Sequence, residues 1–323
     1  MATLLEVQDL EVRFPVKRPF FGPPTEWVRA VQGVSLSLQP GETVGLVGES
    51  GCGKTTLGRA LIRLLEPAAG RILFEGNEIT HWGEQQLRPL RRRFQMIFQD
   101  PYGSLNPRLT VEDIIGEALD IHRLAANAAD RRRRVEQLLA DVGLDPVHAA
   151  RFPHEFSGGQ RQRIGIARAL AVEPRLLVCD EPVSALDVSV QAQIVNLLQD
   201  LQQARGMAYL FVAHDLAVVE HISDRILVMY LGRIVEEGPA SEICASPKHP
   251  YTQALISAIP TVDPDRRRKR MVLGGDPPSP INPPAGCPFH PRCPVAETRC
   301  RTELPALRAL NEKRSAACHL ARR

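Results

Sequence analysis

A glycine-rich segment at residues 48–55 constrains the fold of this 323-residue chain more than any other feature. It fits the pattern G-x-x-x-x-G-K-[ST], which requires a strand before it and a helix after it. Residues 42–47 form a short apolar run typical of a buried parallel strand. Residues 54–65 have a helical pattern that ends before Pro67. The sequence therefore predicts a strand–loop–helix unit that holds phosphate groups.

The residue types in this segment suit phosphate chemistry. Glycines allow backbone N–H groups to approach phosphate oxygens closely, which a Cβ would obstruct, and the following helix adds its positive N-terminal end. Lys54 supplies a cation for the β- and γ-phosphates, and the Thr55 hydroxyl can ligate Mg²⁺. The pattern alone also fits kinases, GTPases and many other ATPases. The candidate nucleotide contacts are Gly48, Ser50, Gly51, Cys52, Gly53, Lys54, Thr55 and Thr56.

Strand and helix patterns alternate along most of the chain. Polar–apolar alternation predicts half-buried strands at residues 4–14 and 34–38, and apolar runs predict buried strands at 176–179 and 208–213. Residues from about 101 to 174 are mostly helical in pattern. This order predicts an α/β fold, with a parallel sheet covered on both faces and interrupted by a helical insert.

Composition separates the end of the chain from the rest. After about residue 260 the sequence becomes polar and basic, and residues 276–287 are rich in proline, which resists regular structure. Four cysteines follow. We therefore predict two domains, residues 1–260 and a small C-terminal module at residues 261–323.

Charge and hydropathy limit the partners and the location. The net charge of +3 is too small to imply nucleic acid as the main partner. The N-terminus does not have the pattern of a signal peptide, and no run of 18 apolar residues occurs. We therefore expect a cytoplasmic protein, whose role at a membrane would come through other subunits.

An acidic pair follows the apolar residues 176–179. Asp180 and Glu181 stand at the carboxyl end of an expected strand, where α/β sheets place their ligands. Asp180 is expected to hold Mg²⁺ through water, and Glu181 to orient or deprotonate the water that attacks the γ-phosphate. One carboxylate there could be an ordinary turn residue, but the loop at residues 48–55 favours a functional pair.

The segment Ser157-Gly158-Gly159-Gln160 is the most informative motif. It offers a hydroxyl and open backbone donors at the start of an expected helix, so it is a second anion-binding end. Alone it could be a helix cap followed by a turn. Two such helix ends with a single acidic strand suggest that a site is completed by another subunit.

With these motifs the chain resembles the nucleotide-binding domain of ATP-binding-cassette (ABC) transporters. The resemblance implies a P-loop ATPase cassette with a mostly parallel core sheet, an N-terminal antiparallel β subdomain and a helical insert. It identifies Gln99 as the glutamine that senses Mg²⁺ and water, Asp187 as the end of the D-loop, and His214 as the switch histidine at the γ-phosphate. Phe14, or alternatively Trp27, would stack on adenine.

The resemblance also implies a head-to-tail pair of cassettes with ATP between them. Lys54 and Thr55 of one chain would face Ser157 and Gly159 of the other, and Gln160 would follow them at the same helix end. ATP would close the pair and hydrolysis would release it. This cycle would drive the membrane subunits between inward and outward states.

Further segments narrow the resemblance to the ATP-binding subunits of bacterial dipeptide, oligopeptide and nickel importers. They are residues 99–107, 184–189, 248–252 and 286–294. This family implies a second, different ATPase subunit, two transmembrane permeases, an extracytoplasmic binding protein, and a peripheral place on the cytoplasmic face of the inner membrane. Peptides are the expected cargo, and nickel, glutathione or another small solute are alternatives. A cassette acting on nucleic acid or ribosomes is the rival class, but such chains tend to carry two cassettes or long insertions.

The four cysteines of the tail are Cys287, Cys293, Cys300 and Cys318. In a cytoplasmic module with little core they suggest a cross-link other than a disulfide. Four thiolates can hold a [4Fe–4S] cluster or a zinc ion, but the close cysteine pairs usual for zinc are absent here. The resemblance to importer ATPases with iron–sulfur tails favours the cluster, and metal-free thiols or disulfides are the alternative.

Overall fold

The computed structural model describes residues 3–16, 24–259 and 271–321. The expected boundary between residues 260 and 261 lies outside these ranges. The chain divides into two compact units. The first unit comprises residues 1–39, 43–81 and 212–323, and the second comprises residues 40–42 and 82–211.

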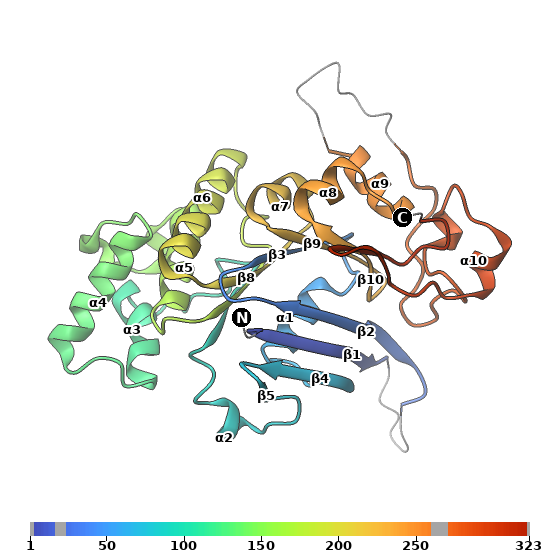
Figure 1. The fold of residues 1–323 in the computed structure, drawn as a ribbon. Helices are drawn as coiled ribbons and strands as arrows, with labels where there is room; N and C mark the ends of the chain where they lie inside the picture. Colours follow the sequence, from blue (N-terminus) through green and yellow to red (C-terminus); the bar gives the residue numbers. More distant parts are fainter. Residues whose placement is uncertain (1–2, 17–23, 260–270, 322–323) are drawn as a thin grey trace. The chain divides into compact units, whose positions relative to one another are not determined.

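The first unit contains two groups of strands and several short helices (Figure 1). Its strands are β1 (Leu5–Pro15), β2 (Trp27–Leu38), β3 (Thr43–Val47), β4 (Ala69–Phe74), β5 (Asn77–Glu78), β9 (Arg225–Tyr230), β10 (Arg233–Pro239), β11 (Arg308–Asn311) and β12 (Arg314–Ala316). Its helices are α1 (Lys54–Leu61), α7 (Leu216–Ile222), α8 (Ala240–Ala245), α9 (Pro250–Ser257), the 3₁₀ helix His290–Arg292 and α10 (Thr298–Thr302).

Strand pairing in the first unit is antiparallel at the N-terminus and parallel near the glycine-rich loop. The order β2-β1-β4-β5 forms an antiparallel sheet, in which β1 alternates buried and more exposed residues over its first half. Strand β3 is buried throughout and pairs with β9 in parallel. Beyond β9 the order continues through β10 and β12 to β11, so the tail contributes strands to the same sheet.

The second unit carries the helical insert. Its strands are β6 (Phe94–Ile97), β7 (Leu176–Asp180) and most of β8 (Ala208–Ala213). Its helices are α2 (Glu84–Leu87), α3 (Val111–Ile121), α4 (Ala128–Asp141), the 3₁₀ helices Pro146–Ala150 and Pro153–Glu155, α5 (Gly158–Leu170) and α6 (Val188–Arg205). Strands β6 and β7 are parallel neighbours, and every residue between them is helical or irregular, as the sequence predicts.

The α/β class, the parallel strands and the antiparallel N-terminal sheet are confirmed. Two expected boundaries are wrong. Helix α1 ends at Leu61 rather than at residue 65, because Arg63 takes a left-handed φ of 55°. The strand expected at residues 34–38 begins earlier, because β2 runs from Trp27 to Leu38 and pairs with β1 along this length. Over the described parts of the chain, no helix has the length and apolar character needed to cross a membrane.

Candidate functional site

The glycine-rich loop joins β3 to α1 in the first unit. Gly53 has a φ of 107°, and a Cβ there would lie 2.1 Å from the carbonyl oxygen of Ala30. A Cβ at Gly48 would lie 2.2 Å from the carbonyl oxygen of Met229. Both glycines are therefore required by the backbone that surrounds the loop, as well as by the ligand chemistry that the motif suggests.

Lys54 is held inside this loop. Its side chain is 4% exposed, and Nζ donates to the carbonyl oxygens of Gly48 at 2.8 Å and Glu49 at 3.0 Å. Among the described side chains, none caps helix α1 at Gly53. The loop therefore combines a buried cation with a helix end that is open to an anion. Burial is the main cause that raises the pKa of the Cys52 thiol, so this cysteine is a neutral part of the loop wall.

The two adenine-stacking candidates, Phe14 and Trp27, lie on the paired strands β1 and β2 of the antiparallel sheet. Phe14 of β1 pairs with Val28, and Trp27 of β2 pairs with Pro15. Phe14 is 38% exposed. Trp27 lies under the guanidinium of Arg13, whose Cζ is 4.8 Å from the ring centroid, and it lines a cavity of about 300 Å³. Both rings are accessible, and they lie one residue apart in the strand register.

The acidic pair closes β7 in the second unit. All five residues of β7 are buried, including Asp180 at 1% exposure. Glu181 adopts a left-handed φ of 45°, which turns the chain sharply out of the strand. Its Oε2 accepts a hydrogen bond from Nε2 of Gln99 at 2.9 Å. The structure therefore brings together two residues that the sequence marks as catalytic, Gln99 and Glu181.

Ser157 begins helix α5 with a reciprocal cap. Its Oγ accepts from the N–H of Gln160 at 3.4 Å, and Oε1 of Gln160 accepts from the N–H of Ser157 at 3.0 Å. A Cβ at Gly159 would lie 2.5 Å from a methyl carbon of Val190. The cap and the close approach to α6 are thus structural reasons for this motif, beside the anion-binding reason.

The remaining predicted residues lie at element ends. Asp187 is the residue that precedes α6. His214 is exposed directly after β8 and belongs to the first unit, as do Thr55 and Thr56 in the first turn of α1. Ser50 and Gly51 are the exposed tip of the glycine-rich loop. Each of these positions suits contact with a ligand or another subunit.

The four tail cysteines are free thiols in the same unit. Cys287, Cys300 and Cys318 are buried and Cys293 is half-buried. Burial raises the pKa of the Cys287 thiol to about 11, with smaller contributions from Cys300, Cys318 and Cys293, so the four lie within electrostatic range. Within the described residues, however, no three His, Cys, Asp or Glu side chains form a group that could hold a metal ion.

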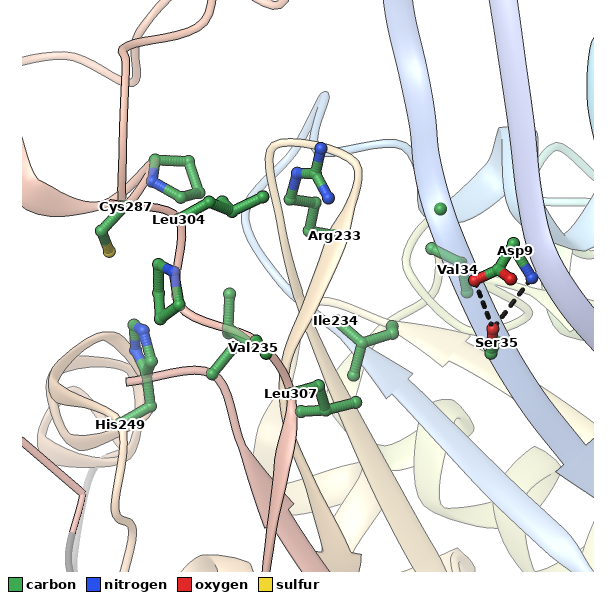
Figure 2. Close-up of a pocket in the computed structure, with 15 residues that line it drawn as sticks. Asp9, Val34, Ser35, Arg233, Ile234, Val235, His249, Cys287, Leu304 and Leu307 are labelled. Carbon is green, nitrogen blue, oxygen red and sulfur yellow. Dashed lines mark hydrogen bonds between the residues drawn. The ribbon is translucent and has the colours of Figure 1, made fainter. Parts of the chain in front are cut away.

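Figure 2 shows a cavity beside this tail. It has a volume of about 350 Å³ and is lined by Cys287, Leu304 and Leu307 of the tail, by residues of β10, and by Asp9 and Ser35 of the N-terminal sheet. Oγ of Ser35 accepts from the N–H of Asp9 at 2.9 Å and donates to its carboxylate at 3.2 Å. One tail thiol therefore lies beside open space.

Tyr251 and Arg292 contact the glycine-rich loop, although neither residue was assigned a role there from the sequence. The N–H of Glu49, in the glycine-rich loop, donates to Oη of Tyr251 at 2.8 Å, and the carboxylate of Glu49 accepts from Arg292 at 2.7 Å. Both partners lie in segments that the family resemblance marks, residues 248–252 and 286–294. The contacts themselves span about 200 residues or more of sequence, which no local pattern reveals.

Solved structures share this fold. The ATP-binding cassette MJ0796, in a dimeric post-hydrolysis state bound to ADP and Pi, matches with a TM-score of 0.65 and 27% identity over 73% of this chain and 98% of its own. cbiO1 from Clostridium perfringens, part of the ABC transporter complex cbiONQ, matches with a TM-score of 0.65 and 27% identity over 76% of this chain and 92% of its own. Fold and site together define an ATP-binding cassette, and the protein is an ABC-type ATPase.

Family models and curated relatives agree. The ABC transporter model matches residues 31–184, and the model of the oligopeptide/dipeptide transporter C-terminal region matches residues 235–300. The chain is 54% identical to the probable peptide ABC transporter ATP-binding protein y4tS of Sinorhizobium fredii, covering 98% of this chain and 90% of the relative.

Two further relatives match this chain over nearly their whole length. The oligopeptide transport ATP-binding protein AppF of Bacillus subtilis is 51% identical over 98% of this chain and 97% of its own. The oligopeptide transport ATP-binding protein OppF of Salmonella typhimurium is 53% identical over 94% of this chain and 92% of its own. This chain belongs to the ABC transporter family of ATP-binding proteins, in the group that carries the oligopeptide/dipeptide transporter C-terminal region.

Proposed function

We propose that this ATPase powers the import of peptides through a bacterial inner membrane, as a peripheral subunit on the cytoplasmic face. The observation that carries this proposal is the likeness to peptide-transport ATPases over nearly the whole chain, with the C-terminal region included. A likeness confined to the cassette would support transport in general. The tail ties the proposal to peptide transporters.

The partners follow from the same likeness. Two permease subunits would form the path through the membrane, and an extracytoplasmic binding protein would deliver the peptide to them. We propose a second, different ATPase subunit as the partner of this chain, as the family resemblance implies. The start of α5 at Ser157 supplies a helix end that could meet the nucleotide held by that partner. In such a pair Ser157 and Gly159 would contact the nucleotide held by the other subunit's loop.

We propose the following roles at the nucleotide. Lys54 and the N–H groups that begin α1 would bind the β- and γ-phosphates, with Thr55 and Asp180 holding Mg²⁺. Glu181 would take the proton of the attacking water, and Gln99 would hold the Glu181 carboxylate through the 2.9 Å hydrogen bond. His214 would contact the γ-phosphate, and Asp187 would lie at the contact between subunits.

We propose Phe14 as the ring that stacks on adenine. Its exposure of 38% supports this choice, and Trp27 is the alternative, with a face already covered by Arg13. Replacing Phe14 with Ala should weaken the binding of a fluorescent ATP analogue roughly fivefold or more, since one stacked base contributes about 1–3 kcal/mol. A larger loss in Trp27→Ala would transfer the role to Trp27.

The four tail thiols have the donor chemistry of a [4Fe–4S] cluster. Their described arrangement does not fit a closed metal site, because no three donors come together. A cluster at Cys287, Cys293, Cys300 and Cys318 would therefore require the tail to close around it. Zinc and metal-free thiols are the alternatives.

Uptake by cells tests the function. A host strain lacking this chain should lose the uptake of labelled di- and oligopeptides, and the wild-type chain should restore it while Glu181→Gln should not. Nickel and glutathione uptake, measured in the same strains, serve as matched controls. Loss of nickel or glutathione uptake with unchanged peptide uptake would contradict the proposed cargo.

A further inference from the structure

The C-terminal tail reaches the phosphate-binding loop through one arginine. Nη1 of Arg292 donates to Oε2 of Glu49 at 2.7 Å, and Nη2 donates to Oε1 at 3.0 Å. Such a two-point pair between a planar guanidinium and a carboxylate is strong and directional. The Arg292 side chain is 7% exposed and that of Glu49 is 29% exposed, so the pair is screened from solvent mainly on the arginine side.

The tail segment that carries Arg292 is anchored by aromatic packing. Phe289 is 1% exposed, and its ring centroid lies 5.3 Å from that of Tyr230 and 5.5 Å from that of Tyr251. The 3₁₀ helix His290–Arg292 follows it directly. Because the buried Phe289 ring fixes the start of this turn, the position of Arg292 relative to Glu49 is also fixed.

Glu49 is held by a second contact on its backbone. Its N–H donates to Oη of Tyr251 at 2.8 Å, so this N–H is committed to the protein. The carbonyl oxygen of Glu49 accepts from Nζ of Lys54 at 3.0 Å. One residue of the loop therefore connects the phosphate-binding lysine with both Tyr251 and Arg292.

The charge of Glu49 matters for an anionic ligand. A carboxylate within a loop that binds a triphosphate repels it, and the repulsion is strong where solvent is partly excluded. Arg292 supplies a compensating charge from within hydrogen-bonding distance. Without Arg292, Glu49 would lower the affinity of the loop for nucleotide and would lose one of its two anchors.

We propose that Arg292 is a positioning residue through which the C-terminal tail sets the ATP affinity of the phosphate-binding loop, by neutralising Glu49. The inference rests on the proposed role of residues 48–55 as the ATP site. It gives the tail a function in the ATPase cycle that does not depend on a metal. It also explains why Arg292 and Tyr251 both contact the loop from segments that carry no nucleotide motif.

The test is a double-mutant cycle read out by binding of a fluorescent ATP analogue to the full-length chain. Arg292→Ala should raise the Kd by roughly threefold to tenfold at low ionic strength, as expected for an uncompensated charge near the phosphates. Adding Glu49→Gln to Arg292→Ala should bring the Kd back to within about twofold of wild type, since the repelling charge is gone. Raising the salt to about 1 M should shrink the defect, because screening then acts over about 3 Å.

Two controls keep the outcomes distinct. Arg301→Ala removes an exposed arginine of the same tail and should leave the Kd unchanged. Arg292→Lys keeps the positive charge and should bind the ATP analogue more tightly than Arg292→Ala. This second variant tests the charge of residue 292 even if Arg292→Ala folds poorly. An unchanged Kd in Arg292→Ala, or a defect that Glu49→Gln does not reverse, would overturn the inference. A wild-type chain that binds no nucleotide would instead overturn the proposed ATP site.

Discussion

The backbone conformation of Glu181 gives its side chain different surroundings from that of Asp180. A φ of 45° is uncommon for a residue with a side chain and carries a cost of about 1–3 kcal/mol. The turn lets the Glu181 side chain accept the hydrogen bond of Gln99 while Asp180, one residue earlier, stays buried in β7. Two adjacent carboxylates thereby obtain different surroundings, which supports their different proposed roles.

Gly53 offers a test of backbone requirements in the loop. Replacing it with Ala should destabilise the fold by about 1–3 kcal/mol, because φ is 107° and the new Cβ would lie 2.1 Å from the Ala30 oxygen. The midpoint of urea unfolding measures the change. Gly165→Ala is the matched control, since Gly165 lies inside α5 with nothing within 4 Å of a new Cβ. Equal unfolding midpoints for the two variants would mean that the backbone at residue 53 does not require glycine.

At the scale of elements, the start of α9 depends on an uncharged histidine. His249 is 1% exposed, its Nδ1 accepts from the N–H of Tyr251 at 3.1 Å, and burial lowers its pKa to about 3. In the unfolded chain its pKa is near 6.5. The unfolded state therefore binds more protons between about pH 3 and 6.5, so acidification within this window lowers the stability contributed by His249.

His249→Asn should remove this part of the pH dependence. Asparagine can still accept the N–H of Tyr251 as a helix cap but does not titrate. The free energy of unfolding, measured at several values from pH 4 to 7, should fall less steeply on acidification in the variant than in the wild type. Identical slopes would mean that His249 is not buried in its neutral form.

Over the whole molecule, the sequence predicted the helices, strands and loops that depend on residues close together in the chain. The loop at residues 48–55, the buried strand before Asp180 and the helix that starts after Ser157 each follow from apolar runs, glycines and caps within a few residues. The hydrogen bond between Gln99 and Glu181 was not predicted; the family resemblance marked Gln99 only as the glutamine that senses Mg²⁺ and water. Local patterns specify these elements because hydrogen bonds and side-chain burial repeat at short spacing.

The contacts of the tail could not be predicted in the same way. Arg292 and Glu49 are 243 residues apart. Strand β12 pairs antiparallel with β10, and a buried ion pair joins Arg314 of β12 to Glu236 of β10. No repeating sequence pattern connects residues this far apart, because they come into contact only when the sheet has formed. The motif at residues 286–294 marked the segment, but its role required the three-dimensional contacts.

Metal content tests whether the cysteine tail can close around a metal in the intact protein. If it holds a [4Fe–4S] cluster, the chain purified without oxygen would carry about four irons and four sulfides, and Cys293→Ser would lose both together. Cys244→Ser is the matched control, because Cys244 is a buried cysteine of α8 outside the tail. Stoichiometric zinc would make the tail a zinc site, and neither metal would leave four reduced thiols.

Hydrolysis of MgATP by the purified chain, paired with the proposed second ATPase subunit, tests the role of Glu181 most directly when wild type is compared with Glu181→Gln. The variant should still bind ATP while its turnover falls by at least about a hundredfold, since removing a general base typically costs that much or more. Glu220→Gln, an exposed position on α7, should hydrolyse at the wild-type rate. Turnover by Glu181→Gln at the wild-type rate would contradict the role of Glu181 as the base of an ATP-hydrolysing site.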